Sequence, residues 1–95
     1  MTAQASEAWR VKVLIPTPLR SYTAAREVEA TGVTVAAVLL DLDRHHPGIR
    51  FRIVDEQDRI RRHVRLFVNG AQVFDLAHAL RPGDQVTIVQ ALSGG

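Results

Sequence analysis

The residues best suited to chemistry in this sequence are the two glycines at its end, Gly94 and Gly95. They follow the segment Q-V-T-I-V-Q-A-L-S, whose apolar pattern is that of a strand, and Gly95 carries a carboxylate. Because glycine has no β-carbon, a Gly-Gly segment can lie extended in a narrow channel and bring its backbone close to a partner's active site. Small residues at a chain end are common in themselves. The preceding strand nevertheless favours the Gly95 carboxylate as the reacting group.

The other chemistry-bearing side chains form no catalytic or metal-binding motif. The four histidines are adjacent or lie on separate elements, and no carboxylate stands at a zinc-motif spacing from them. The sequence has no cysteine, no G-x-S-x-G motif and no phosphate-binding glycine loop. Its carboxylates are scattered over turns and hydrophilic faces rather than paired for acid–base catalysis. We therefore expect no bound metal, no cofactor of its own and no enzymatic activity.

Six arginines lie between residues 50 and 65, interleaved with Asp55, Glu56 and Asp58. A nucleic-acid-binding surface is typically of one sign and carries exposed aromatic side chains. This segment is mixed in sign, and its only aromatic residue is Phe51. It is therefore predicted to be a solvated face or a docking site for an acidic protein surface, not a nucleic-acid interface.

The length of 95 residues and the composition, 46% hydrophobic and 23% charged, predict a single domain with one modest core. Residues 1–8 have neither the basic start nor the apolar centre of a secretory signal and are expected to be flexible. No apolar run approaches the length of a membrane span. We expect a cytoplasmic protein with no membrane partner.

The first half of the chain reads as a hairpin followed by a helix. Residues 9–15 and 26–30 alternate between apolar and charged residues, which predicts two paired strands. The prolines at 16 and 18 end the first strand, and residues 19–22 are expected to form a turn. Thr34 can cap a helix that ends at residues 45–48. Its predicted core positions are Val35, Val38, Leu39 and Leu42, and its predicted hydrophilic positions are Asp41, Asp43 and Arg44.

The second half contributes the remaining strands. Residues 49–62 predict a short helix or turn and then an arginine-rich loop, and residues 63–69 predict a strand. Asn69-Gly70 is a hairpin-turn signal, so residues 71–74 are expected to return as a short strand. A connector over 75–80 and a turn over 81–84 lead to the final strand. On the strand over 63–69, alternation turns Val64, Leu66 and Val68 inward and Arg65 and Phe67 outward.

This element order predicts an α+β fold with one main helix packed across a mixed sheet of four or five strands. The first and last strands are expected to be central and parallel, so that residues 92–95 project beyond the sheet as a tail. The outward aromatic ring of Phe67 beside Arg65 has the composition of a partner surface. The competing interpretation, that a loop partly covers this sheet face, remains open.

The element order, the motif V-N-G at residues 68–70, the motif P-G-D-x-V-T-I at 82–88 and the terminal S-G-G together resemble the ThiS/MoaD family. These proteins are ubiquitin-like β-grasp sulfur carriers. The I-P-T-P-L-R run at residues 15–20, the length and the arginine-rich segment are most similar to the CysO branch, which serves actinobacterial cysteine synthesis. The resemblance extends from Val11 to Gly95.

The resemblance implies that an E1-like enzyme (MoeB/ThiF type) binds MgATP and adenylates the Gly95 carboxylate. Sulfur then replaces AMP and leaves a thiocarboxylate. A tail of Leu92, Ser93, Gly94 and Gly95 would thread the partner's active site, since four extended residues reach roughly 13 Å. The resemblance also implies a docking surface in which Phe67, with Leu92, is the apolar part and Arg65 the charged rim.

The same resemblance leaves the final sulfur acceptor open. In the CysO branch the thiocarboxylate feeds a sulfur-accepting synthase, a PLP-dependent sulfhydrylase that makes cysteine, and a metalloprotease releases the product. Related carriers serve molybdopterin, thiamin, tRNA or secondary metabolites, and one fold with one tail serves them all. The sulfur donor, the sharing of the carrier between pathways and the oligomeric state also stay open, with a monomer as the default expectation.

Two alternatives come from other classes of protein. The chain could be a ubiquitin-like modifier joined to lysines of target proteins through Gly95, since activation by adenylation is common to both classes. Its single lysine, Lys12, argues against self-linked chains but not against single attachment. The chain could also be a passive interaction domain, in which case removal of Gly95 would change nothing.

Overall fold

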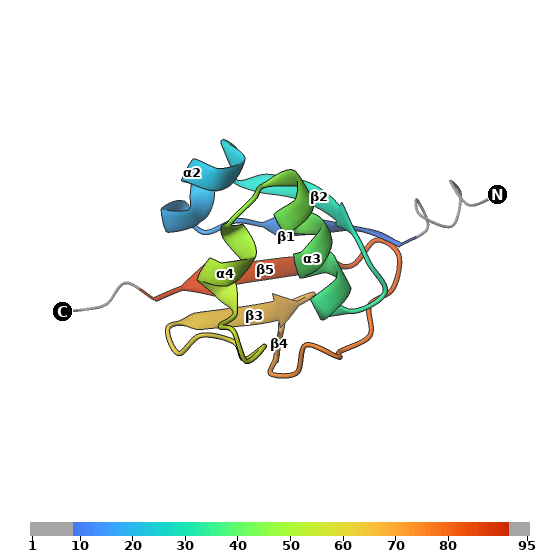
Figure 1. Ribbon diagram of the computed structural model, residues 1–95. Coiled ribbons are helices and arrows are strands. Elements are labelled where there is room, and N and C mark those ends of the chain that lie inside the picture. Colours follow the sequence, from blue (N-terminus) through green and yellow to red (C-terminus); the bar gives the residue numbers. More distant parts are fainter. Residues whose placement is uncertain (1–8, 92–95) are drawn as a thin grey trace.

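The last strand lies at the centre of a five-stranded mixed sheet with the order β2-β1-β5-β3-β4, between the first strand and the third. The computed structural model describes residues 9–91 (Figure 1). β1 pairs with β2 antiparallel and with β5 parallel, while β3 pairs antiparallel with both β5 and β4. The predicted parallel pairing of the first and last strands is thereby confirmed. The strands are β1 (Arg10–Leu14), β2 (Glu27–Thr31), β3 (Val64–Val68), β4 (Ala71–Val73) and β5 (Gln85–Gln90).

The longer helices lie over one face of this sheet (Figure 1). A turn was expected over residues 19–22, but residues 17–23 are helical. Pro16 precedes a single 3₁₀ turn, which runs into one short α-helical segment that is capped by Ala24 with φ 58°. The side chain of Arg20 donates to the Ile15 carbonyl over 2.9 Å and ties this segment to β1. The helices are η1 (Thr17–Leu19), α2 (Arg20–Thr23), α3 (Val35–His45) and α4 (Ile49–Ile53).

The hydrophobic core lies between the helices and the sheet, as the alternation predicts. Alternate apolar residues of β1, β3 and β5 point into it, and the predicted face of α3 and the two isoleucines of α4 cover it on the helical side. Each of these side chains is at most 7% exposed. The core includes Val11, Val13 and Ile15 in and just after β1, Val64, Leu66 and Val68 in β3, Val86 and Ile88 in β5, Val35, Val38, Leu39 and Leu42 in α3, and Ile49 and Ile53 in α4.

The helix α3 begins as predicted but differs on its polar side. The Thr34 hydroxyl oxygen accepts from the Ala37 N–H over 3.1 Å, which is an N-cap. The prediction that Asp41 lies on the hydrophilic side is wrong, because Asp41 is buried and only 6% exposed. Its carboxylate accepts from the Thr31 N–H over 2.9 Å and from the Arg44 guanidinium over 2.7 Å. The end of β2 meets α3 at this point, and helical periodicity does not show that contact.

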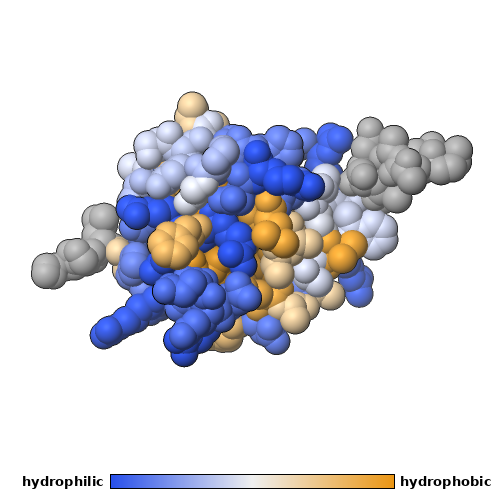
Figure 2. All heavy atoms as spheres, in the orientation of Figure 1, coloured by the Kyte–Doolittle hydropathy of each residue, from blue (hydrophilic) through white to orange (hydrophobic). Residues whose placement is uncertain are grey.

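The arginine-rich segment after α4 is a short, closed loop. Val54 and Ile60 form an isolated antiparallel bridge, and the Asp55 carboxylate accepts from the N–H groups of Gln57 and Arg59. Hydrophilic side chains gather over this loop (Figure 2). The prediction of a short helix followed by an arginine-rich loop is confirmed.

Candidate functional site

The strand β5 carries the chain through the centre of the sheet to the predicted tail. β3 pairs with it as far as Gln90, and the Ala91 N–H then donates to the His63 carbonyl over 2.8 Å. The four predicted tail residues, Leu92, Ser93, Gly94 and Gly95, follow at once and lie outside the described residues. Their role stays a prediction, but the chain that precedes them is hydrogen-bonded within the sheet up to residue 91.

The opposite end of β5 is fixed by the two motifs that carried the resemblance. The Asn69 side chain donates to the Asp84 carboxylate and accepts from the Gln85 N–H, each over 2.9 Å. The other oxygen of Asp84 accepts from the Arg81 N–H over 2.8 Å. This hydrogen bond, more than the opposing effect of burial, lowers the pKa of Asp84, and the Asn69 amide lowers it further. These hydrogen bonds thus connect the two turns and set the register between β3 and β5.

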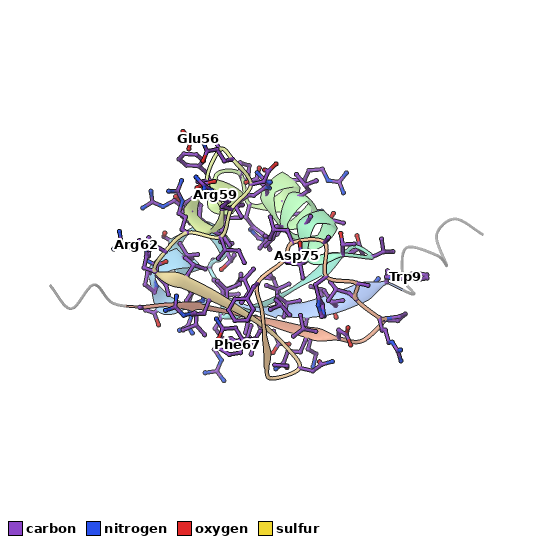
Figure 3. All side chains as sticks on the ribbon, turned by 90° about the horizontal axis from the view of Figure 1, so that it is seen from below. Trp9, Glu56, Arg59, Arg62, Phe67 and Asp75 are labelled. Atoms are coloured by element: carbon purple, nitrogen blue, oxygen red, sulfur yellow. The ribbon has the colours of Figure 1, made fainter. Side chains whose placement is uncertain are left out.

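The sheet face turned away from the helices holds the predicted docking residues. Figure 3 shows Phe67 on this face, with the helices on the other side of the sheet. Phe67 lies opposite Thr87 of β5 and Gln72 of β4, and Arg65 lies opposite Val89. Phe67 is half-buried rather than freely exposed, and its role in docking stays a prediction. Arg65 is exposed, and its guanidinium turns back to the Arg62 carbonyl over 3.0 Å.

Two further apolar residues of this face were not predicted from the sequence. Val89 is 40% exposed and lies one step along the sheet from Phe67. Leu14 is half-buried and pairs with Thr87, so it reaches the same row from β1. Strand alternation could have found both, because each directly adjoins core residues in sequence and must therefore point the other way. We call Leu14, Phe67, Thr87 and Val89, with Arg65 at its edge, the open-face patch.

A second group of residues surrounds the point where β5 ends. A hollow of about 250 Å³ is lined by Phe51, Arg52, Arg61, His63 and Gln90. The guanidinium of Arg61 lies 4.5 Å from the centroid of the Phe51 ring, and its Nε donates to the Phe51 carbonyl over 2.6 Å. The arginine-rich loop therefore places positive charge beside the root of the tail. The sequence pattern indicated no such position for these residues.

The histidines are dispersed over the surface of the fold. The ring of His45 contacts the Asp41 carbonyl and that of His46 the Tyr22 carbonyl, over 3.0 and 3.2 Å. Between residues 9 and 91, no three His, Cys, Asp or Glu side chains are grouped as ligands for a metal ion. Over the same range, no helix has the length and apolar character needed to cross a membrane.

The sequence as a whole matches known proteins over the length of this fold. The model of the ThiS family matches residues 13–95. The sulfur carrier protein CysO of Mycobacterium tuberculosis is 40% identical over 91 residues, which cover 90% of this chain and 98% of that protein.

Solved structures of similar proteins match this fold over nearly the whole chain. The crystal structure of the BexX/CysO complex of Amycolatopsis orientalis contains a chain with a TM-score of 0.83 and 37% identity, with 90% of this chain and 99% of that chain covered. The small archaeal modifier protein SAMP1 of Methanosarcina acetivorans has a TM-score of 0.78 and 25% identity, with 93% and 98% covered. The predicted ubiquitin-like β-grasp fold is confirmed.

Proposed function

Because this chain belongs to the ThiS family, we propose that it is a sulfur carrier whose Gly95 carboxylate is activated by a partner enzyme and converted to a thiocarboxylate. The observation that carries the proposal is the placement of β5. This strand lies between two others in the sheet, is held up to Ala91 by the bond to His63, and is followed directly by L-S-G-G. The fold therefore fixes the root of a tail that is narrow enough to enter another protein's active site.

Activation is needed because the carboxylate oxygen is a poor leaving group. In the proposed reaction a Gly95 oxygen attacks the α-phosphorus of MgATP, pyrophosphate leaves and an acyl-adenylate forms. A hydrosulfide-equivalent nucleophile then attacks the acyl carbon, and the bond to AMP breaks. The carrier supplies the reacting carboxylate and the docking surface. It binds no cofactor of its own, and the E1-like partner in the cytoplasm holds the MgATP and performs the catalysis.

The open-face patch is the proposed docking surface for this partner. It combines a half-buried aromatic ring, two aliphatic side chains and an arginine at its edge, a composition enriched at protein interfaces. Val89 lies on β5 itself, three residues before Leu92. A partner that holds the patch therefore also receives the tail. The BexX/CysO complex supports the idea that a carrier of this kind forms an assembly with a protein partner.

The similarity to CysO favours cysteine synthesis as the destination of the sulfur. The acceptor would then be a PLP-dependent sulfhydrylase, and a metalloprotease would release the amino acid from Gly95. The sulfhydrylase and the metalloprotease must both accept the same tail. We therefore expect each of them to compete with the E1-like enzyme for it. Molybdopterin, thiamin and secondary-metabolite pathways are the other destinations within the family.

The direct test is intact-protein mass spectrometry after incubation with an E1-like enzyme, MgATP and sulfide. We expect a mass increase equal to the exchange of one oxygen for sulfur, and none in a variant that lacks Gly95. Circular dichroism of that variant controls for folding. The E1-like enzyme is first shown to activate the carrier protein that it normally serves. If this active enzyme then gives neither the oxygen-to-sulfur exchange nor AMP release with the present chain, the proposal is overturned.

A second candidate function is that of a protein modifier, which the similarity to SAMP1 favours. A modifier would form an amide between the Gly95 carbonyl and a lysine of a target protein. Digestion after Leu92 would leave a Ser-Gly-Gly remnant on that lysine, detectable in peptides from cell extracts. Such remnants would support the modifier, whereas a free thiocarboxylated pool without remnants would support the carrier.

A further inference from the structure

An open groove of about 710 Å³ lies beside the outer edge of β3 and shares only Arg65 with the open-face patch. The loop after α4 forms one wall and the segment that follows β4 forms the other. Figure 3 shows Arg59 and Arg62 on the side of the loop and Asp75 across from them. Phe67 and Val89 do not line this groove, so it is a second surface whose function the tail does not explain.

The apolar part of the groove comes from both walls. Ile60 and Leu76 are half-buried against the core, and Val73 forms part of the floor. Phe74 stands at the rim with 79% of its surface exposed, the largest fraction among the exposed large apolar residues of the described chain. An aromatic ring so exposed beside a half-buried aliphatic floor is typical of a binding surface for an apolar side chain.

The charge of the groove is predominantly positive. Four arginines line it, Arg59, Arg61, Arg62 and Arg65, against two aspartates, Asp58 and Asp75. Asp58 already pairs with Arg50 over 2.8 Å, and Asp75 accepts from the Ala77 N–H over 2.9 Å. Within residues 9–91, Arg61, Arg62 and Arg65 have no carboxylate within 4.0 Å. These three side chains therefore have no acidic partner among the described residues, although the Arg61 guanidinium contacts the ring and carbonyl of Phe51 and that of Arg65 donates to the Arg62 carbonyl.

The shape of the groove favours an extended occupant. β4 is only three residues long and pairs with β3 from Leu66 to Val68. Val64 and Arg65 lie beyond its end, and the groove runs beside this part of β3. An extended segment can lie along such an uncovered strand edge and place alternate side chains on its two sides. One side would meet the arginines and the other the apolar floor.

We propose that this groove binds an extended, acidic segment of a partner protein, with an apolar side chain seated against Phe74, Ile60 and Leu76. Charge complementarity decides the class of occupant, since four arginines and only two aspartates line the groove around its apolar floor. A nucleic acid fits less well, because Asp58 and Asp75 would face its phosphates and Phe74 is the one exposed aromatic ring in the groove. This inference goes beyond the proposed function and does not depend on activation of Gly95.

The test uses the full chain, labelled with ¹⁵N, and a synthetic peptide with Glu and Asp residues on both sides of a Leu-Val pair. We expect chemical-shift changes at Ile60, Phe74 and Leu76 on titration. The variants Arg62→Glu and Phe74→Ala should each weaken binding at least about tenfold, the loss typical of a charged or aromatic anchor. Both side chains are exposed, so both variants should keep the native spectrum.

Matched controls test the specificity of the effect. Arg26→Glu makes the same charge change at the start of β2, on the other edge of the sheet, and Leu40→Ala truncates an apolar side chain that is 56% exposed on α3. Both should bind the peptide like the wild type, and the same peptide with Gln in place of its acids should bind at least about tenfold more weakly.

Three results would overturn the proposal. They are no shift changes in the groove, shift changes confined to the open-face patch or the root of the tail, and tighter binding of a single-stranded oligonucleotide to the same residues. Because this experiment contains neither an E1-like enzyme nor ATP, its failure would leave the sulfur-carrier proposal unaffected.

Discussion

The carboxylate of Asp41 shows how one buried charge can join two elements. Burial by itself acts to raise its pKa, but the hydrogen bonds from the Thr31 N–H and the Arg44 guanidinium, with the nearby His45, outweigh this and lower it. A group whose pKa is lower in the folded state stabilises that state when it is ionised. The contribution of Asp41 is therefore complete above the ordinary pKa of 3.8 and is lost as the pH falls through the lower, folded value.

We expect Asp41→Asn to lower the free energy of unfolding at pH 7 by about 1–3 kcal/mol, because it weakens bonds to a charged, buried acceptor. The loss of stability of the wild type on acidification should become smaller in this variant, since the introduced amide cannot take up the proton. Urea denaturation between pH 7 and pH 2 measures both effects. Glu56→Gln, an exposed change on the loop, is the control and should leave the pH profile as it is. A profile of Asp41→Asn parallel to that of the wild type would contradict this account.

Phe67 is the residue through which the open-face patch can be tested. Its ring is the largest side chain of the patch and is already half-buried, so a partner gains its remaining apolar surface at small entropic cost. Phe67→Ala should weaken binding of the E1-like enzyme at least about tenfold, measured by calorimetry, while the native circular dichroism spectrum persists. Leu40→Ala, on the helical side, should bind normally. Equal affinity of the Phe67→Ala variant and the wild type would remove Phe67 from the docking surface.

At the scale of elements, the register between β3 and β5 decides where the tail leaves the sheet. Two distant turns fix it, because Asn69 follows β3 and Asp84 precedes β5, and their side chains bond directly. Asn69 has φ 50° and Gly70 φ 88°, so the hairpin turn demands residues that tolerate a positive φ. A slip of β3 by one residue against β5 would move Phe67 into the core and expose Leu66.

The turn contact predicts a measurable coupling. Asn69→Gly keeps a residue that tolerates φ 50° but removes both side-chain bonds, and should lower the free energy of unfolding by about 1–2 kcal/mol. Asp84→Ala should have a similar effect, and the double variant should lose less than the sum of the two because they remove a shared bond. Urea denaturation of the four proteins in this cycle measures the coupling, with Gln72→Ala as a surface control. Strict additivity would show that the bond between the turns contributes nothing.

At the scale of the whole molecule, the two proposed binding surfaces lie on different parts of the fold. The open-face patch lies on the side of the sheet away from the helices and continues along β5 towards the tail. The groove lies at the edge of the sheet between the loop after α4 and the segment after β4 (Figure 3). Arg65 is the residue that the two share. A carrier with this arrangement could hold one partner at the groove while another receives Gly95.

This separation predicts independent effects. Arg62→Glu and Phe74→Ala should leave the rate of adenylation by the E1-like enzyme within about twofold of the wild type, and Phe67→Ala should leave the affinity for the acidic peptide equally unchanged. Pyrophosphate release and fluorescence anisotropy of a labelled peptide measure the two activities. Loss of both activities in one well-folded variant would show that the two surfaces are one.

Most of the local elements and their order could be predicted from the sequence, although residues 19–22, expected as a turn, lie in a helical segment. Alternation along the strands, the Thr34 cap, the Asn69-Gly70 turn and the strand that precedes Gly94-Gly95 depend on short-range preferences of the chain, and a single sequence displays these directly. The resemblance to the family rested on the element order and on the short motifs V-N-G, P-G-D-x-V-T-I and S-G-G, which a single sequence also displays directly.

Which distant residues meet could be read only from the folded chain. The burial of Asp41 depends on where the end of β2 crosses α3, and the open-face patch depends on the register of three strands. The groove exists because β4 ends early and the loop after α4 closes beside β3. Such contacts join segments far apart in the chain, and local preferences do not specify them. Only packing of the single core fixes their geometry.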